Sequence, residues 1–447
     1  MPSIAFDSAI FRDLFGTPDM RTIFSDEGLV ARYVQVEVAL AAAEAAVGVI
    51  PRAAAEAIAA GTDAAKIDIA QLEAETAVVG YPIVGIVHQM AEQCGDAGRF
   101  VHWGATTQDI MDTATVLQLR DALALVGADL AAIETALEHL TRKHRDTVMA
   151  GRTHLQHALP VTFGYKTAVW LSMIRRHRQR LAQLEPRVLV AQFSGAAGTL
   201  ASLGDQGMAV QAAFADALDL AQPDITWHAA RDGVAEAVSF LGLVTGSLSK
   251  IAVDVMLMMQ TEVGEAFEPF VPGRGSSSTM PQKRNPISCE MIVALAKTVR
   301  AQAGLMLDAM AADHERATGP WHIEWIALPQ AFVASSGALY QARFMLEGLI
   351  VEPAAMRRNL DATGGLIVAE AVMMALAPHI GRGAAHDVVY ACCRAALETG
   401  TPLLHQLRKR PDITAHFDGP ALEALVDPGN YLGAAPAMVD RMLARTI

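Results

Sequence analysis

Three long stretches of this chain contain no proline, and they constrain its fold. They run over residues 161–185, 224–268 and 287–319. Proline lacks the amide hydrogen of a helical bond and clashes with the preceding turn, so its absence permits long unbroken helices. In the second stretch, apolar residues recur at steps of three and four at Val234, Val238, Leu241, Val244, Leu248, Ile251, Val255 and Met258. We therefore expect helices that are apolar on most sides and pack inside a bundle or at a subunit interface. Lys250 and Asp254, four residues apart, are expected to pair on the polar face.

The composition favours an all-α fold. Alanine and leucine are abundant, only 6% of residues are aromatic, and no alternating run rich in Val, Ile and Thr lies between hairpin turns. A chain of 447 residues can bury a large core and should divide into two or three domains. The helical pattern breaks over residues 95–104 and again at Gly364 and Gly365. We expect an N-terminal helical domain (1–108), a central bundle of long helices (109–356) and a C-terminal helical domain (357–447).

The charge balance and the cysteines narrow the class of protein. There are 35 basic and 48 acidic residues, a net charge of −13, and no basic cluster, which argues against nucleic acid as a partner. The four cysteines have no metal-ligand spacing and are typical of thiols in a reducing compartment. The N-terminus has early acids and no apolar core, unlike a signal peptide. The long apolar stretches contain charges, unlike membrane spans. We expect a cytoplasmic protein that does not bind a membrane.

The most informative polar segment is Gly275 to Pro286, which reads GSSSTMPQKRNP. Its glycine and serines supply backbone freedom and closely spaced N–H groups. Lys283 and Asn285 add a cation and an amide donor. Such a loop can fold over an anion and donate hydrogen bonds to charge that develops on it. The alternative is a flexible serine-rich linker, but linkers rarely combine Met-Pro, Asn-Pro and a lysine at this spacing.

Two further polar segments interrupt the helical pattern. The first, residues 102–109, places the neutral donors Thr106, Thr107 and Gln108 just before a helix, which suits a carboxylate site but also a plain capping box. The second, residues 151–160, carries His154 and His157 before a proline that is expected to open the next long helix. Either histidine alone is more often structural than catalytic.

Together, these segments resemble the fumarase/aspartase superfamily in type and in order along the chain. Its signature loop reads G-S-S-x-M-P-x-K-x-N-P, and here Met280, Lys283 and Asn285 match it. The first signature serine then falls on Ser277 and the second on Ser278. The resemblance extends over essentially the whole chain. It implies a three-domain all-α fold with a central bundle of long helices, and a homotetramer in which three chains form each active site.

The resemblance also assigns roles to these residues. Removing a proton beside a carboxylate creates a doubly charged aci-carboxylate, which fixed donors must stabilise. In this superfamily the base is the loop serine, here Ser277, while Ser278, Lys283 and Asn285 stabilise the developing charge. His154 matches the general acid, with His157 the other candidate. Thr106, Thr107, Gln108, Thr153 and Gln156 are expected to bind the second carboxylate of a small di- or tricarboxylate. No metal or organic cofactor is expected.

Within the superfamily, the chain most resembles 3-carboxy-cis,cis-muconate cycloisomerases, through LFGTPDMRTIFSDE, VHWGATTQDIMDTATVLQLRDAL, HERATGPWHIEW and RRNLDATGGLIVAEAV. That reaction joins a carboxylate oxygen to a double bond while the neighbouring carbon takes a proton. One residue departs from the pattern, because bacterial cycloisomerases keep only the counterpart of His157. His154 therefore also suits a C–N lyase that releases fumarate from an N-substituted aspartate. An inactive structural protein is a third hypothesis. Arg152, Arg231 and Arg316 are candidates for an additional acidic group of the substrate, or ordinary surface and helix-end arginines.

Overall fold

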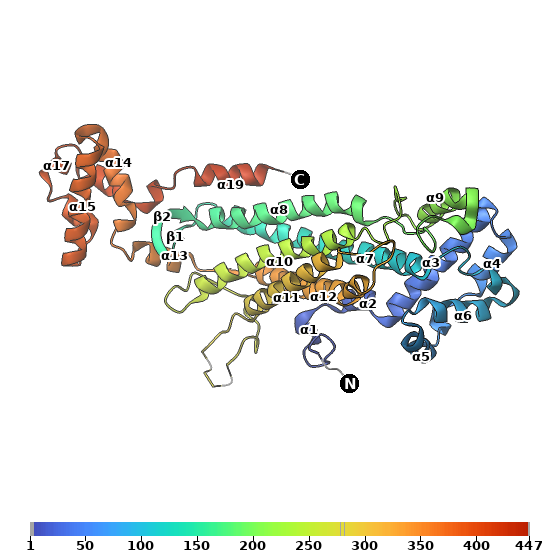
Figure 1. Cartoon of the computed structure of the whole chain (residues 1–447). Helices are drawn as coiled ribbons and strands as arrows, with labels where there is room; N and C mark the ends of the chain where they lie inside the picture. Colours follow the sequence, from blue (N-terminus) through green and yellow to red (C-terminus); the bar gives the residue numbers. More distant parts are fainter. Residues whose placement is uncertain (1–3, 278, 281, 446–447) are drawn as a thin grey trace. The chain divides into compact units, whose positions relative to one another are not determined.

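The computed structural model describes residues 4–277, 279–280 and 282–445. Its regular structure is almost entirely helical, so the all-α prediction is confirmed (Figure 1). In the described part of the chain, five helices have 23 to 37 residues each. They are α7 (Thr107–Lys143), α8 (Phe163–Val188), α10 (Asp232–Met259), α11 (Ile287–Ala309) and α12 (Pro320–Glu347). The three proline-free stretches coincide with α8, α10 and α11, and Lys250 and Asp254 of α10 form the expected ion pair.

Shorter elements flank the long helices. Before and between them lie α1 (Arg12–Phe15), α2 (Pro18–Ile23), α3 (Asp26–Val47), α4 (Arg52–Gly61), α5 (Ile69–Val79), α6 (Ile83–Cys94) and α9 (Gly207–Ala217). After them lie α13 (Pro353–Asp361), α14 (Ala369–Ile380), α15 (Arg382–Thr399), α16 (Leu403–Leu407), α17 (Pro411–Thr414), α18 (Gly419–Val426) and α19 (Ala435–Ala444). Short 3-10 turns are η1 (Ala64–Lys66), η2 (Gly95–Phe100), η3 (Ala201–Gln206), η4 (Leu366–Val368) and η5 (Pro428–Asn430).

Two small antiparallel sheets complete the fold. Strand β1 (Val148–Thr153) pairs with β2 (Gln156–Thr162), and β3 (Ala266–Phe267) pairs with β4 (Ile350–Val351). The first pair corrects two expectations. Residues 148–162 form a hairpin where no strand signal was recognised, and Pro160 lies inside β2, so it does not open α8, which begins at Phe163.

The chain divides into two compact units. Unit 1 comprises Met1–Ala131, His177–Ser249 and Met291–Gln341, and unit 2 comprises Ala132–Arg176, Lys250–Glu290 and Ala342–Ile447. The expected domain boundaries after residues 108 and 356 remain a prediction. The expected break at Gly364 and Gly365 is present, because both residues have positive φ (62° and 92°) between α13 and η4.

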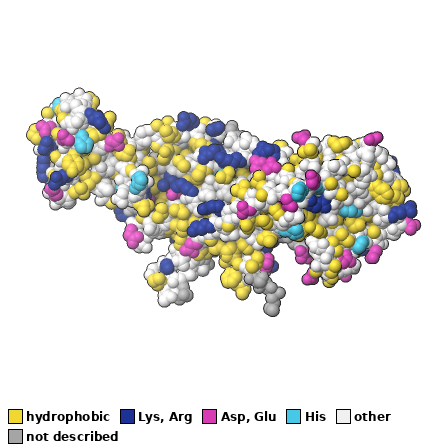
Figure 2. All heavy atoms as spheres, viewed as in Figure 1, with side chains coloured by type: hydrophobic (Ala, Val, Ile, Leu, Met, Phe, Trp, Pro, Cys, Tyr) yellow, Lys and Arg dark blue, Asp and Glu magenta, His cyan; other side chains and the backbone are white. Residues whose placement is uncertain are grey.

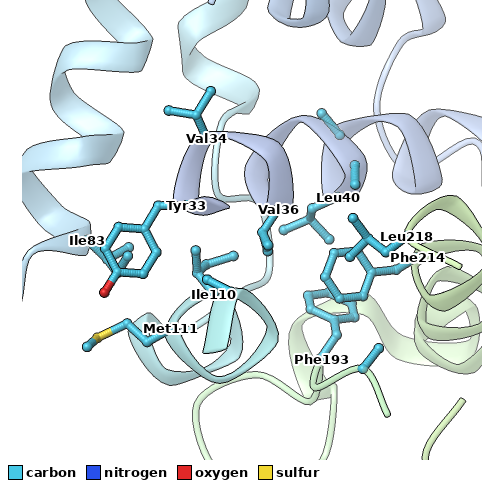
Figure 3. Packing of buried hydrophobic residues seen from close by; sticks show 14 of the residues in the cluster. Tyr33, Val34, Val36, Leu40, Ile83, Ile110, Met111, Phe193, Phe214 and Leu218 are labelled. Carbon is cyan, nitrogen blue, oxygen red and sulfur yellow. The ribbon is translucent and has the colours of Figure 1, made fainter. Parts of the chain in front are cut away.

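The core of unit 1 forms around α3. Ser25 caps this helix by accepting a hydrogen bond from the Gly28 N–H at 3.1 Å, and Gly48 ends it in the left-handed conformation. Figure 3 shows side chains of α3 meeting those of α6, α7 and α9, with Val36 and Leu40 near the middle of the cluster. This packing places the N-terminus of α7, where the threonines of the first polar segment lie.

Unit 2 contains two smaller apolar clusters. One joins α14, α15, α16 and α18 through buried residues that include Leu376, Val389 and Leu422. The other packs Ala150 of β1 against Leu360 of α13 and Val368 of η4. The base of the hairpin is therefore fixed by the core, while its turn projects from it.

One long helix bears on the membrane prediction. By length and composition alone, α10 is apolar enough to cross a membrane, as is the bent pair formed by Pro353–Asp361 and Leu366–Ile380 if it counts as one span. Buried core helices of soluble proteins meet the same criterion. The absence of a membrane partner therefore remains a prediction.

The buried carboxyl group of Glu44 on α3 should make stability fall at alkaline pH. Glu44 is fully buried, and neither of its carboxyl oxygens has a hydrogen-bond partner among the described residues. Burial and the nearby Glu37 carboxylate raise the pKa of Glu44 to about 9, from an ordinary value of 4.5. The native state thus holds this proton more tightly than the unfolded chain does. The stabilisation is complete below pH 4.5 and is lost as pH rises towards 9.

We expect Glu44→Gln to remove this pH dependence, because glutamine keeps the shape of the side chain and does not ionise. Between pH 6 and 8, the free energy of unfolding of the wild type should fall by about 3 kcal/mol relative to the variant. Urea denaturation at the two pH values measures the difference. Glu27→Gln, at an exposed position of the same helix, is the control. Parallel pH profiles for the wild type and Glu44→Gln would contradict the prediction.

Candidate active site

Ser277 lies in a loop that directs backbone donors at its own hydroxyl group. The Ser277 Oγ accepts hydrogen bonds from the N–H groups of Thr279 at 3.2 Å and Met280 at 3.0 Å. A further turn forms where the Lys283 N–H donates to the Met280 carbonyl at 3.1 Å. Two donors on one hydroxyl oxygen stabilise negative charge there when the proton leaves. This geometry suits a serine that acts as a base.

The two ends of this loop contact each other. The Asn285 N–H donates to the Gly275 carbonyl at 3.0 Å, and Ser276 pairs with Arg284 in an isolated antiparallel bridge. Gly275 has a φ of +68°, and a Cβ added there would lie 2.6 Å from the Asn285 carbonyl oxygen. No other residue fits this position without displacing the backbone. Lys283 is exposed on the loop, Asn285 is half-buried, and Ser278 lies outside the described residues.

The loop is joined firmly to α11. The buried Glu268 carboxylate accepts from the N–H groups of Ser288 at 3.2 Å and Cys289 at 2.8 Å, in the first turn of that helix. The Arg284 guanidinium donates to the Glu268 carbonyl oxygen at 3.0 Å. A carboxylate at a helix N-terminus satisfies free N–H groups and complements the helix dipole. These contacts therefore fix the point where the loop joins α11.

His154 occupies the turn of the β1–β2 hairpin. Thr153 pairs with Gln156 across a two-residue turn, and the residues between them, His154 and Leu155, have φ values of 50° and 63°. Positive φ at both central positions is the arrangement of a type I′ turn, which normally favours asparagine and glycine. All four residues are exposed. The hairpin thus presents the His154 imidazole to solvent at the cost of local backbone strain.

His157 lies on strand β2 of the same hairpin, just beyond the turn, and its environment differs from that of His154. It is half-buried, and its Nδ1 atom is buried without a partner in the described structure. Burial and the neighbouring Arg152 guanidinium lower the pKa of His157. At neutral pH its imidazole is therefore neutral and better suited to accept a proton than to donate one. Arg152 is itself held by the fully buried Glu265 through two hydrogen bonds of 2.8 and 2.7 Å.

The first polar segment (residues 102–109), called the threonine segment below, leads into the first turn of α7, as expected. Asp109 reaches back to accept from the Thr106 N–H at 2.9 Å, which is half of a capping box. Thr106 and Thr107 are half-buried. Gln108 is buried, and its amide donates to the Asp112 carboxylate at 3.1 Å and the His228 carbonyl at 2.9 Å. Its amide nitrogen therefore donates to groups inside unit 1.

The predicted residues fall into separate groups. Thr106, Thr107 and Gln108 belong to unit 1, and the hairpin and the serine loop belong to unit 2. Among the described residues, no hydrogen bond or ion pair joins Ser277, Lys283 or Asn285 to His154 or His157. Each group is ordered by its own neighbours.

Sequence reasoning missed the buried residues that hold the threonine segment. The Asp109 carboxylate also accepts from the N–H groups of Ser194 and Gly195, both at 2.9 Å, and lies 2.8 Å from His228 Nε2. Nearby, His102 contacts the buried Glu37 carboxylate at 2.6 Å. These three partners of Asp109 are 85 to 119 residues away in sequence, so no local pattern could have revealed them.

Of the three candidate arginines, Arg231 is not available to a substrate. It is buried and bonds the Asp112 carboxylate at 2.7 and 2.9 Å and the Glu324 carboxylate at 2.8 Å. Arg152 is bound to Glu265, as described above. Arg316 is half-buried and donates to the Ala196 carbonyl at 2.9 Å. Arg231 does lie at a helix end, because it directly precedes α10, but two carboxylates hold it in the interior, so the expectation of a surface arginine was wrong.

No cluster of three or more His, Cys, Asp or Glu residues with metal-binding geometry is present among residues 4–277, 279–280 and 282–445.

The family of the chain follows from comparison with known proteins. A family model described as "Lyase" matches residues 15–301, and one described as "Adenylosuccinate lyase C-terminus" matches residues 365–442. The chain belongs to the fumarase/aspartase superfamily. It is therefore an enzyme that acts as a lyase or an intramolecular lyase.

Three relatives of this superfamily member have different activities. It is 51% identical to trans-aconitate decarboxylase 1 of Mycosarcoma maydis over 100% of this chain and 90% of the relative. It is 47% identical to the 3-carboxy-cis,cis-muconate cycloisomerase of Pseudomonas aeruginosa over 97% and 96% of the two chains. It is 39% identical to the N-acetyl-S-(2-succino)cysteine lyase of Dickeya dadantii over 99% and 98%.

Solved structures of the superfamily share its fold. The fumarate lyase of Mesorhizobium sp. BNC1 is 55% identical, with a TM-score of 0.91 over 96% of this chain and 99% of that one. The 3-carboxy-cis,cis-muconate lactonizing enzyme of Pseudomonas putida is 45% identical, with a TM-score of 0.94 over 98% of each chain. The fumarase/aspartase-like fold is confirmed.

Proposed function

We propose that this lyase acts on a small tricarboxylate, and that its reaction is the cycloisomerisation of 3-carboxy-cis,cis-muconate. The observation that carries the proposal is the Ser277 hydroxyl, whose oxygen accepts two backbone N–H groups in the signature loop. The compounds named in the three relatives, trans-aconitate, 3-carboxy-cis,cis-muconate and N-acetyl-S-(2-succino)cysteine, each contain three carboxylates. A tricarboxylate is thus common to relatives with different reactions.

In the proposed reaction, Ser277 moves one proton. In the lactone-opening direction, its alkoxide removes the proton beside a carboxylate, and the resulting charge is stabilised by Lys283, Asn285 and the loop N–H groups. The electron pair then forms the carbon–carbon double bond, and the lactone C–O bond breaks to give a free carboxylate. In the forward direction, the carboxylate oxygen adds to the double bond and the Ser277 hydroxyl returns the proton. Lactone formation therefore consumes one proton, which solvent water restores to the Ser277 alkoxide before the next turnover, and lactone opening releases one proton to solvent.

Elimination of an amine or thiol from a succinyl adduct is the second candidate. The observation that favours it is His154, which the hairpin turn exposes. A carboxylate leaves a lactone without protonation, whereas a departing nitrogen gains from a general acid. The relatedness to N-acetyl-S-(2-succino)cysteine lyase supports the same chemical class.

One ultraviolet assay separates these candidates. Lactone formation from 3-carboxy-cis,cis-muconate removes a conjugated diene, so absorbance should fall, whereas elimination that releases fumarate makes absorbance rise. We expect a fall with carboxymuconate and no change with N- or S-succinyl adducts. Release of carbon dioxide from trans-aconitate should be tested in parallel. Turnover of only a succinyl adduct or of trans-aconitate would reject our first choice, and no turnover of any compound would favour an inactive structural protein.

The contribution of His154 should differ between the two chemistries. Because His154 has a φ of 50°, asparagine is the replacement that best keeps the turn. For a cycloisomerase, we expect His154→Asn to change kcat by less than about 10-fold and a variant at His157 to be more damaging. For a C–N lyase, the loss should be about 10²-fold or more, because the departing nitrogen needs a proton. Kinetics on the substrate identified by the screen measure it, and a large loss in lactone formation would contradict the assigned leaving group.

We also propose a homotetramer with active sites shared between chains. The long helices expose large apolar side chains, among them Leu243, Leu307, Ile326 and Tyr340, each more than half exposed. Figure 2 shows hydrophobic side chains spread over much of the displayed face. Surfaces of this kind are usually covered by another subunit. Light scattering should give a mass of about four chains, and a monomer would reject the proposal. We further propose a cytoplasmic location, from the cysteine pattern and the N-terminal sequence.

A further inference from the structure

A pocket of about 340 Å³ lies beside the hairpin in unit 2. Its walls come from the hairpin, from the first turns of α8 and from two residues of α10. Thr153, next to His154 in sequence, is part of the wall, so the pocket adjoins the hairpin turn. Apolar side chains that include Leu159, Val169 and Trp170 line further parts of it, and the Asp254 side chain lines it too.

Three cations line this pocket, and two of them already have carboxylate partners. Arg152 is bound to Glu265, which also accepts from the Asn359 amide at 2.9 Å. Lys250 is paired with Asp254, and the Asp254 carboxylate also accepts from Trp170 Nε1 at 2.9 Å. These carboxylates are thus already occupied.

Lys166 is the third cation, and its ammonium group has no ion-pair partner in the part of the chain that the structure describes. Lys166 is half-buried on α8. Burial lowers the pKa of Lys166 and the nearby Lys250 and Arg152 lower it further, against the raising effect of Asp254 and Glu265. A half-buried ammonium group without a partner is costly, and a bound anion would compensate it.

We propose that this pocket is the subsite for the third carboxylate of the substrate, and that Lys166 is the residue that selects tricarboxylates over dicarboxylates. The inference rests on the proposed function, because it assigns the extra carboxylate of that substrate class. Lys166 supplies the charge, Thr153 supplies a hydroxyl donor, and the apolar wall contacts the carbon chain. The reacting carbon then lies towards the hairpin turn.

Binding of two unreactive acids to the full assembled protein tests the subsite. Tricarballylate carries three carboxylates, and glutarate has the same chain without the middle one. Isothermal titration should show that Lys166→Met lowers the affinity for tricarballylate by about 10-fold or more, because one charged contact is lost. The affinity for glutarate should change by less than about 2-fold. Lys166→Arg, which keeps the charge, should recover part of the affinity. Lys409→Met, at an exposed position outside the pocket, is the charge-matched control, and thermal unfolding checks that each variant is folded.

The outcomes separate this inference from the proposed function. If Lys166→Met lost affinity equally for both acids, or lost none for tricarballylate, the role of Lys166 would be overturned whatever reaction the enzyme performs. A selective loss for tricarballylate together with no turnover of any tricarboxylate would leave the subsite supported and reject the proposed reaction. A loss with Lys409→Met equal to that with Lys166→Met would show only a long-range effect of net charge and would also overturn the subsite.

Discussion

Ser277→Ala is expected to lower kcat by about 10²- to 10⁴-fold, the typical effect of losing a general base. The replacement removes the only atom of Ser277 that can carry the proton, and with it the acceptor of the Thr279 and Met280 N–H groups. Because the side chain belongs to a loop whose base is fixed separately at Glu268 and α11, the helical fold should persist. Steady-state kinetics on the substrate found in the ultraviolet screen provide the measurement.

The neighbouring serines supply the controls. Ser276→Ala changes an exposed hydroxyl of the same loop and should stay within about 10-fold of the wild-type rate, because that hydroxyl has no assigned part in proton transfer. Retention of more than roughly a hundredth of the wild-type rate by Ser277→Ala would remove Ser277 from the role of base. If Ser278→Ala were then inactive, the assignment would move to Ser278.

Arg231→Leu is expected to destabilise the protein by about 3–5 kcal/mol, because it leaves the Asp112 and Glu324 carboxylates buried without their cation. Both carboxylates and the arginine are at most 4% exposed. Burial already raises the pKa of Glu324, with Arg231 opposing the rise, so removal of the arginine should favour protonation of that carboxyl group. Urea denaturation at pH 7 measures the loss, which should shrink at lower pH as the carboxyl groups take up protons.

Two further variants test the cause of this loss. Arg231→Lys keeps the charge but cannot bond both carboxylates in the same planar arrangement. Its free energy of unfolding should therefore lie between those of Arg231→Leu and the wild type. Arg187→Leu removes an exposed arginine paired with Glu236 and should lower the free energy of unfolding far less than Arg231→Leu does. If Arg231→Leu lowered the free energy of unfolding no more than Arg187→Leu, the buried contacts of Arg231 with Asp112 and Glu324 would not stabilise the protein.

The assignment of roles to the two histidines came only partly from the sequence. The spacing of His154 and His157 marked both as candidates, and the superfamily resemblance favoured His154 as the acid. The structure adds that His154 is exposed on a strained turn, whereas His157 is half-buried with a lowered pKa. These differences arise from the hairpin, and the sequence signal for that hairpin was weak because its turn has histidine and leucine where asparagine and glycine are usual.

The sequence by itself determined the features that depend on neighbouring residues. The steps of three and four in α10 and the absence of proline predicted long helices, because helical bonds join residues one turn apart. The signature loop was recognisable because its donors follow one another in the chain. The tertiary structure alone decided the buried polar partners. Asp112 bonds Arg231 across 119 residues and Trp321 across 209, and such contacts depend on which helix faces pack together, which no local pattern records.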